Sequence, residues 1–177
     1  MSINQLIGGL VSLLLLPSSF AQPPFEVLRS CVDEKPYNNK VTIHIKDDGS
    51  YADNHEKNCE ERFEVSFDNK MYGFVRCTDI PYLVVNDQKI NLEKAENRSV
   101  NPEIKPGMLY PTDTSWSKID FKNQSYLCLN GPISRSGTGS NIGQYYIIEN
   151  AFEKNIIPII YYYFFNKDII PITSNNY

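Results

Sequence analysis

The sequence predicts a single, mostly β domain, either an antiparallel sandwich or a partly open barrel of about eight to ten strands, with at most one short helix. Three observations predict this fold class. Apolar and polar residues alternate over several short runs, as in strands with one buried face. Turn-forming residues separate these runs. The C-terminal part is rich in Ile, Tyr and Phe, which favour a half-buried pleated surface.

Length and composition fit one globular domain. The chain has 177 residues, of which 41% are hydrophobic and 12% aromatic, enough for a sizeable core. Its formal net charge is −4, whereas a nucleic-acid or anionic-membrane surface requires clustered Lys and Arg. We therefore expect no nucleic-acid partner.

Residues 1–21 have the pattern of a secretory signal peptide. The apolar run 6–16 is too short to span a bilayer stably, and residues 19–21 fit a small-residue cleavage site that precedes Gln22. No Lys or Arg precedes the apolar run, so a buried N-terminal strand or helix is the alternative. We expect residues 22–177 to be a single exported β domain, secreted or periplasmic, with no stable membrane span.

All four cysteines lie after the predicted cleavage site: Cys31, Cys59, Cys77 and Cys128. An even number in an oxidising compartment predicts two disulfides. No C-x-x-C pair occurs and neither histidine has a second ligand at zinc spacing, so metal binding by these thiols is the lesser alternative. We predict neither a metal site nor a cofactor.

The favoured pairing is Cys59–Cys77, which leaves Cys31–Cys128. If Asp68-Asn69-Lys70 forms a three-residue hairpin loop, Cys59 and Cys77 become diagonal neighbours on one face, within bridging reach. A two-residue turn shifts the register by one residue and places the two sulfurs on opposite faces. The pairing argument therefore depends on this turn.

The first half of the mature chain contains three strand patterns. Residues 41–46 alternate apolar and polar, with a turn expected at Asp48-Gly49. Residues 62–77 form the clearest hairpin, because Phe, Val and Phe share one face of its first strand. Residues 82–92 predict a second hairpin that turns at Asn86-Asp87.

The second half begins with the only expected helix, a short one over residues 91–98 with a weak apolar face. Residues 99–115 contain three prolines and predict a long surface connection. Two short strands should flank Asn123-Gln124. Further strands are expected within residues 144–152 and 156–172, which are rich in Ile, Tyr and Phe.

The segment Gly131–Tyr146 contains four glycines and one arginine in sixteen residues. Its G-x-G-x-x-x-G pattern is one residue longer than the dinucleotide fingerprint, and a strand-like run follows it where a helix is needed. It contains neither Gly-Lys-Ser/Thr nor G-x-S-x-G, so a P-loop and a nucleophile elbow are both excluded.

What remains is a loop of small polar residues between two strands. Glycines allow a partner to approach the backbone, and free N–H groups beside Arg135 would suit a carboxylate or phosphate. The predicted binding residues are Arg135, Ser136, Gly137, Gly139, Ser140, Asn141 and Tyr145. The alternative is a flexible hairpin loop without a role.

The sequence therefore predicts an exported, disulfide-containing, non-catalytic binding protein, such as an inhibitor, an immunity protein or a ligand-binding module. It would use residues 134–145 to bind a protein or a small polar ligand in the cell envelope. The alternative is a small secreted hydrolase that uses His44 or His55 with a serine and a carboxylate. Trp116 and residues 161–165 also suit an aromatic platform, although alternate residues of a strand face opposite sides and at least half of the run should be core.

Overall fold

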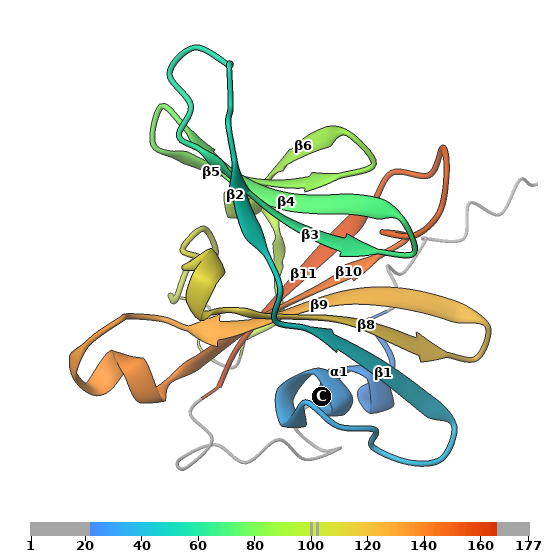
Figure 1. The fold of residues 1–177 in the computed structure, drawn as a ribbon. Helices are drawn as coiled ribbons and strands as arrows, with labels where there is room; N and C mark the ends of the chain where they lie inside the picture. The colour runs from blue at the N-terminus through green and yellow to red at the C-terminus, as the bar shows by residue number, and fades with distance from the viewer. Residues whose placement is uncertain (1–21, 100, 102, 166–177) are drawn as a thin grey trace, which may run out of the picture.

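The computed structural model describes residues 22–99, 101 and 103–165 (Figure 1). It confirms a mostly β fold: the described residues form two sheets, of six and five strands, with one α-helix. The predicted signal peptide and the last part of the predicted C-terminal strand region lie outside the described residues. Among the described residues, no helix has the length and apolar character to cross a membrane.

The six-stranded sheet lies at the centre of the molecule and has the order β1-β8-β9-β10-β11-β7. Its strands are β1 (Val41–Lys46), β8 (Ser115–Phe121), β9 (Gln124–Pro132), β10 (Gly143–Glu149), β11 (Ile159–Phe165) and β7 (Glu96–Asn97). All neighbours pair antiparallel except β11 and β7, which are parallel.

The five-stranded sheet follows chain order from β2 to β6. Its strands are β2 (Ser50–Ala52), β3 (Arg62–Phe67), β4 (Lys70–Cys77), β5 (Ile80–Val85) and β6 (Gln88–Asn91). Two-residue turns with positive φ join β3 to β4, β4 to β5 and β5 to β6, at Asp68-Asn69, Thr78-Asp79 and Asn86-Asp87. Asn and Asp tolerate this left-handed conformation better than most residues, which explains why they recur at the turns.

The chain passes from one sheet to the other between β1 and β2. The turn expected at Asp48-Gly49 does not fold the chain back as a hairpin, since β1 belongs to the six-stranded sheet and β2 to the five-stranded sheet (Figure 1). A Cβ on Gly49 would lie 2.2 Å from the ring of Phe63. Glycine therefore lets the chain cross closely over this ring at the corner of the sandwich.

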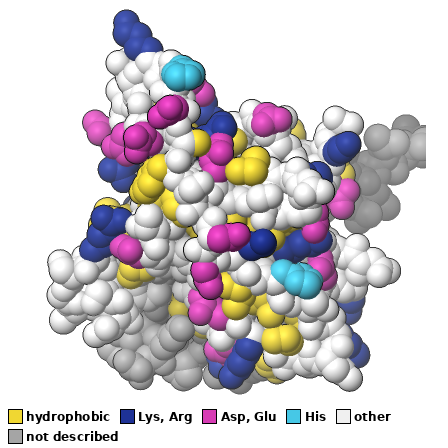
Figure 2. Space-filling model, viewed as in Figure 1, with side chains coloured by type: hydrophobic (Ala, Val, Ile, Leu, Met, Phe, Trp, Pro, Cys, Tyr) yellow, Lys and Arg dark blue, Asp and Glu magenta, His cyan; other side chains and the backbone are white. Residues whose placement is uncertain are grey.

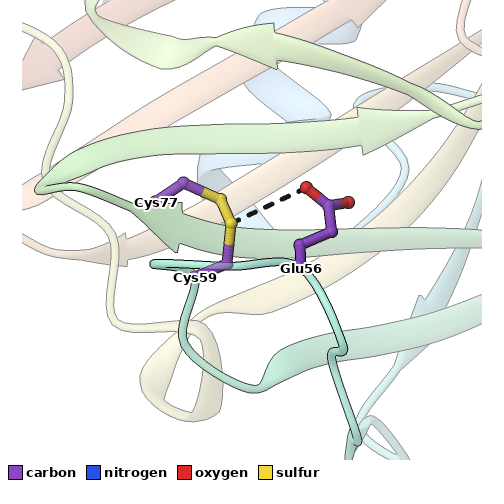
Figure 3. A group of neighbouring side chains, drawn as sticks. All are labelled: Glu56, Cys59 and Cys77. Atoms are coloured by element: carbon purple, nitrogen blue, oxygen red, sulfur yellow. Dashed lines mark hydrogen bonds between the residues drawn. A yellow bond between two sulfur atoms is a disulfide. The ribbon is translucent and has the colours of Figure 1, made fainter.

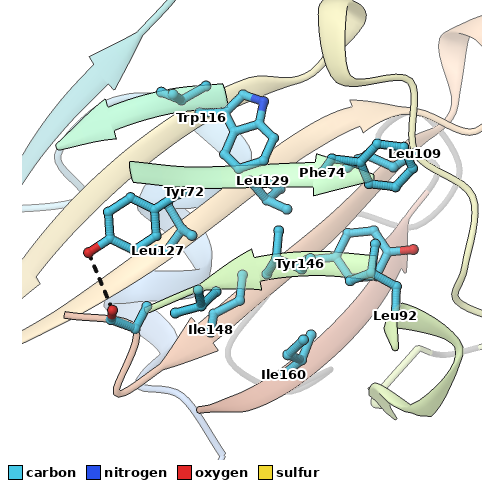
Figure 4. Close-up of a cluster of buried hydrophobic side chains, with 14 of the residues drawn as sticks. Tyr72, Phe74, Leu92, Leu109, Trp116, Leu127, Leu129, Tyr146, Ile148 and Ile160 are labelled. Atoms are coloured by element: carbon cyan, nitrogen blue, oxygen red, sulfur yellow. Dashed lines mark hydrogen bonds between the residues drawn. The ribbon is translucent and has the colours of Figure 1, made fainter. Parts of the chain in front are cut away.

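The core fills both faces of the six-stranded sheet. The larger cluster lies between the two sheets and includes Trp116, Leu129 and Tyr146 opposite Phe74 and residues of its sheet (Figure 4). A second cluster lies on the other face, beneath the α-helix. Successive side chains of a strand point to opposite faces, so strands buried on both sides have long apolar runs.

The helix α1 (Phe25–Asp33) covers this second face, and the sequence analysis did not predict it. Val27, Leu28, Cys31 and Val32 are buried against the sheet, a helical spacing that was available as a signal in the sequence. The helix expected at 91–98 is wrong. That region contains a single 3₁₀ turn, η1 (Leu92–Lys94), followed by β7. Leu92 is the one buried residue of the turn, and a longer helix would need a continuous apolar face.

The structure contains the disulfides Cys31–Cys128 and Cys59–Cys77, the pairing that the sequence favoured. The reasoning about the hairpin register, however, is wrong. Lys70 belongs to β4 and pairs with Phe67, so the turn has two residues and not three. Cys59 and Cys77 nevertheless face each other, because the register changes between Phe63 and Cys59.

A β-bulge brings the two sulfurs to the same face. Phe63 pairs with Phe74, whereas Cys59 pairs with Cys77, so the first strand holds one more residue than the second between these two pairs. An extra residue on one strand reverses the facing of everything beyond it. The Cα atoms of Cys59 and Cys77 consequently lie 4.0 Å apart, directly opposite each other.

Candidate functional site

The glycine-rich segment is a compact connection between neighbouring strands. It leaves β9 at Pro132, forms the 3₁₀ helix η3 (Gly137–Asn141) and enters β10 at Gly143 (Figure 1). Ile133 N donates to Ile142 O at 3.0 Å, and Ser140 Oγ donates to Gly137 O at 2.8 Å. Several of its polar groups are therefore already satisfied within the loop.

Two of its glycines are required for different reasons. Gly137 has a φ of 69°, in the left-handed region, and a Cβ there would have open space around it. Gly139 is constrained by contact, since its Cβ would lie 2.8 Å from Cβ of Ser134. A larger residue strains the backbone at Gly137 and the loop packing at Gly139.

Arg135 contacts a neighbouring segment of the chain. Its Nε lies 2.7 Å from Oδ2 of Asp113, its Nη2 donates to Oγ1 of Thr112 at 3.1 Å, and its guanidinium stacks 4.8 Å from the ring centroid of Tyr110. A guanidinium that already pairs with a carboxylate has little positive charge to offer an incoming anion. An anion that binds beside Arg135 would therefore have to compete with Asp113 for the guanidinium.

The partner of Arg135 is fixed by the core. Asp113 ends the 3₁₀ helix η2 (Pro111–Asp113), which begins with a proline preset for a helical φ. The buried indole of Trp116 donates from Nε1 to Pro111 O at 3.4 Å. This bond and the buried ring of Pro111 anchor η2 to the sandwich and so hold the Asp113 carboxylate beside the loop.

Tyr145 is not a loop residue. It is the third residue of β10, and its side chain is completely buried against the face covered by α1. Burial is the main cause that raises the pKa of its phenol well above the usual value, so the group stays neutral. Tyr145 is therefore a fixed core residue at the base of the loop and not a mobile loop side chain.

A cleft of about 370 Å³ lies between the glycine-rich loop and the end of α1. Ser140, Asn141 and Tyr145 line it, while Arg135, Ser136, Gly137 and Gly139 do not. The structure thus brings three of the seven predicted binding residues to one cavity. The others shape or brace the loop around it.

The lining of the cleft contains two carboxylates, one of which, Asp113, is paired with Arg135 outside the lining. Glu34, the left-handed residue that ends α1, and Asp113 both line the cleft, whereas no Lys or Arg belongs to its lining within the described residues. Asn130 donates from Nδ2 to Glu34 Oε1 at 3.1 Å and to the carbonyl of Cys31 at 3.4 Å. The C-terminal end of a helix adds partial negative charge, so this cleft favours a cationic or hydrogen-bond-donating group.

Sequence reasoning missed Glu34, Asp113 and Asn130 as site residues. None of them belongs to a recognisable motif, and they come from three separate segments of the chain. The available signal was indirect: Asn130 directly precedes the glycine-rich segment that begins at Gly131. Their convergence depends on α1 docking over β9, which a linear pattern does not encode.

Among the described residues, neither histidine forms the triad that the hydrolase alternative needs. His44, on β1, lies with Nε2 3.9 Å from Oδ2 of Asp120, and Ser125 donates to the other oxygen of Asp120 at 2.5 Å. A Ser-His-Asp triad needs the histidine between serine and carboxylate, but here the carboxylate lies between the other two. His55 is exposed in the β2–β3 loop, and no carboxylate or hydroxyl of the described chain pairs with it.

The aromatic residues considered as a platform are core residues. Trp116 and the three tyrosines at 161–163 are each at most 2% exposed. They pack on both faces of the six-stranded sheet, as alternation along β11 requires. None of them offers a ring face to a sugar or peptide at the surface.

Three ligand-type side chains gather elsewhere, at the base of the β2–β3 loop. Glu56, Cys59 and Cys77 place one oxygen and two sulfurs within 4.8 Å of one another (Figure 3). The two sulfurs are bonded to each other and carry no thiolate charge in this state. The group is therefore a surface disulfide with a neighbouring carboxylate.

The sequence matches no family model, and neither the curated proteins nor the solved structures show a significant likeness to this chain.

Proposed function

We propose that the protein is an exported, disulfide-stabilised binding protein, and that the cleft beside η3 is its binding site. Residues 22–177 form the exported domain after removal of residues 1–21. Two disulfides suit an oxidising compartment. The partner is a protein or a small polar ligand of the cell envelope that presents a cationic group.

One observation carries this proposal: polar groups from four separate segments converge on a single concave cavity. Glu34 comes from the end of α1, Asp113 from η2, Asn130 from β9 and Ser140 from η3. A few convergent polar groups in a concave cavity are what ligand sites share. Asp113 already pairs with Arg135, so Glu34 is the lining carboxylate that would attract an ammonium or guanidinium group in preference to an anion.

Titration of the isotope-labelled mature protein with tri-lysine, tri-glutamate and tri-alanine tests the proposal by NMR. We expect chemical-shift changes at Ser140, Asn141 and the side-chain amide of Asn130 with tri-lysine only. Added salt should weaken them, because the attraction is electrostatic. Equal changes with all three peptides, or no changes, would exclude a cation-selective cleft.

A pair of variants separates the cleft from general surface charge. Ser140→Arg introduces a competing cation into the cleft and should abolish the response to tri-lysine. Ser66→Arg adds the same charge on an exposed position of β3, outside the cleft, and should leave the response intact. Equal loss in both variants would show that net charge, and not the cleft, attracts the peptide.

A further inference from the structure

The two disulfides differ in their accessibility. Cys31 and Cys128 are buried, at 0% and 1% exposure, between α1 and the six-stranded sheet. Cys59 and Cys77 are only partly covered, at the base of the β2–β3 loop (Figure 3). A soluble thiol therefore reaches the second bond without disturbing the core, whereas the first requires opening of the core.

The charges around Cys59–Cys77 are arranged asymmetrically. Lys89, on β6, places its Nζ 3.9 Å from Sγ of Cys77 and also pairs with Glu56. The Glu56 carboxylate lies 3.7 Å from Sγ of Cys59. An ammonium group stabilises a neighbouring thiolate and a carboxylate destabilises one. Cys77 is therefore the better leaving group of the two.

We propose that Cys59–Cys77 is a site of thiol–disulfide exchange for a dithiol reductant, such as a dithiol oxidoreductase of the same compartment. A thiolate of the reductant attacks Sγ of Cys59 and forms a mixed disulfide, while the Cys59–Cys77 bond breaks and Cys77 leaves as a thiolate beside Lys89. The second thiol of the reductant then attacks the mixed disulfide and releases Cys59. The protein disulfide gains two electrons and, after protonation, two protons, and the dithiol is oxidised to a disulfide.

The fold tolerates this opening. The bond closes a segment with a sequence separation of 18, and the β3–β4 hairpin already closes most of it through the pairs from Phe63↔Phe74 to Phe67↔Lys70. Backbone bonds from Glu60 N to Arg76 O and from Thr78 N to Asn58 O, both 2.9 Å, flank the disulfide. Because these pairs and backbone bonds hold the two strands together independently of the disulfide, we expect reduction to loosen the loop and leave the core folded.

The segment released by reduction is the β2–β3 loop. It projects from the five-stranded sheet at the top of Figure 1, and Figure 2 shows acidic and basic side chains side by side on this projection. Its remaining links to the rest of the chain include the Glu56–Lys89 ion pair, which is exposed and weak. Exchange at Cys59–Cys77 would therefore control the mobility of this exposed, charged loop.

The first test treats the folded mature protein with limiting dithiothreitol, traps free thiols with iodoacetamide and maps the labelled peptides. We expect label on Cys59 and Cys77, with Cys31–Cys128 intact and the circular dichroism of the sheets unchanged. Trapping of the first step with glutathione should place the mixed disulfide on Cys59. Equal labelling of both disulfides, labelling only after denaturation, or glutathione on Cys77 would each overturn the proposal.

Two substitutions distinguish electrostatic control from simple loosening. Lys89→Met should slow reduction of Cys59–Cys77 several-fold, because the leaving thiolate loses its cation, and Lys89→Arg should restore the rate. Glu56→Gln should speed reduction, because it removes a carboxylate from beside the attacked sulfur. Both variants break the same ion pair, so loosening alone predicts faster reduction in both and would refute the charge argument. Lys40→Met, an exposed lysine beside β1, serves as the control and should change nothing.

Discussion

Tyr146 and Tyr162 are opposite one another on β10 and β11, with ring centroids 5.0 Å apart, but their hydroxyl groups differ. The hydroxyl of Tyr146 accepts a hydrogen bond from Gly107 N at 2.9 Å and donates one to Met108 O at 3.1 Å. The hydroxyl of Tyr162 is buried without a hydrogen-bond partner among the described residues. One ring thus anchors the backbone at Gly107 and Met108, whereas the other only fills the core.

This difference predicts opposite outcomes for the same chemical change. Tyr146→Phe should lower the free energy of unfolding by about 1–3 kcal/mol, because it leaves two backbone groups without their partner. Tyr162→Phe should change it by less than about 0.5 kcal/mol or stabilise the fold, since it removes an unsatisfied hydroxyl. Urea unfolding of the two variants measures both values. An equal cost at the two positions would contradict the hydrogen-bond assignment.

The ion pair between Asp68 and Lys118 joins the β3–β4 turn to the central sheet and predicts a pH dependence. Lys118 is the main cause that lowers the pKa of Asp68 below 3.8, and Asp68 in turn raises the pKa of Lys118 above 10.5. A lowered carboxyl pKa stabilises the fold above the unfolded value and loses this effect as the pH falls. A raised lysine pKa stabilises below its unfolded value and loses this effect as the pH rises.

Asp68→Asn should therefore destabilise the protein near neutral pH and have a smaller effect at an acidic pH below the lowered pKa of Asp68, where the wild-type carboxyl is also protonated. Asp79→Asn is the matched control, because Asp79 is exposed in the equivalent β4–β5 turn and also has a positive φ. It should change stability little at either pH. Urea unfolding at the two pH values gives the comparison, and a pH-independent loss in Asp68→Asn would remove the role of charge.

Buried phenols predict alkaline unfolding. Burial raises the pKa of Tyr126 and of Tyr162 to about 12, whereas an unfolded tyrosine ionises near pH ~10. The unfolded state therefore loses protons first, and stability falls as the pH rises from about 10 towards 12. Absorbance at the tyrosinate band should rise together with the loss of tertiary circular dichroism. In urea the same absorbance should rise earlier, and identical curves with and without urea would contradict the burial effect.

The corner at Gly49 predicts a strong dependence on one neighbour. Gly49→Ala should destabilise the fold by about 1–3 kcal/mol, because its Cβ would lie within 2.5 Å of two ring atoms of Phe63. In a Phe63→Leu background the same substitution should cost clearly less, since a shorter side chain leaves space. A double-mutant cycle by urea unfolding measures this coupling. Strict additivity would place the cost in the backbone and not in the contact.

Arg135→Ala provides a prediction opposite to the one that the sequence suggested. Loss of an exposed pair should lower stability by less than about 1 kcal/mol, while Asp113 gains free negative charge beside the cleft. We expect tri-lysine to bind more tightly to this variant. Arg62→Ala, which removes a remote ion pair with Glu64, is the control and should leave binding unchanged. Weaker binding in Arg135→Ala would show that Arg135 itself contacts the ligand.

The sequence alone determined the features that depend on residues close together in the chain, such as the buried face of a strand and the position of a turn. Alternation over 62–67 predicts one buried face because side chains of a strand point to opposite sides, and β3 buries Phe63, Val65 and Phe67. The turn at Asn86-Asp87 was also predictable, since Asn and Asp tolerate a positive φ at little cost. Such effects act within a few residues of the chain.

Tertiary structure alone decided the site and the chain path around it. The chain passes from β1 to β2 at Gly49, where glycine has no Cβ to clash with the ring of Phe63. The face on which Cys59 lies depends on a β-bulge between Phe63 and Cys59. Arg135 looked like a free anion-binding group, and it is neutralised by Asp113, which the core holds through Trp116. Coulombic pairing and packing depend on distance in space, which the order of residues along a chain does not specify.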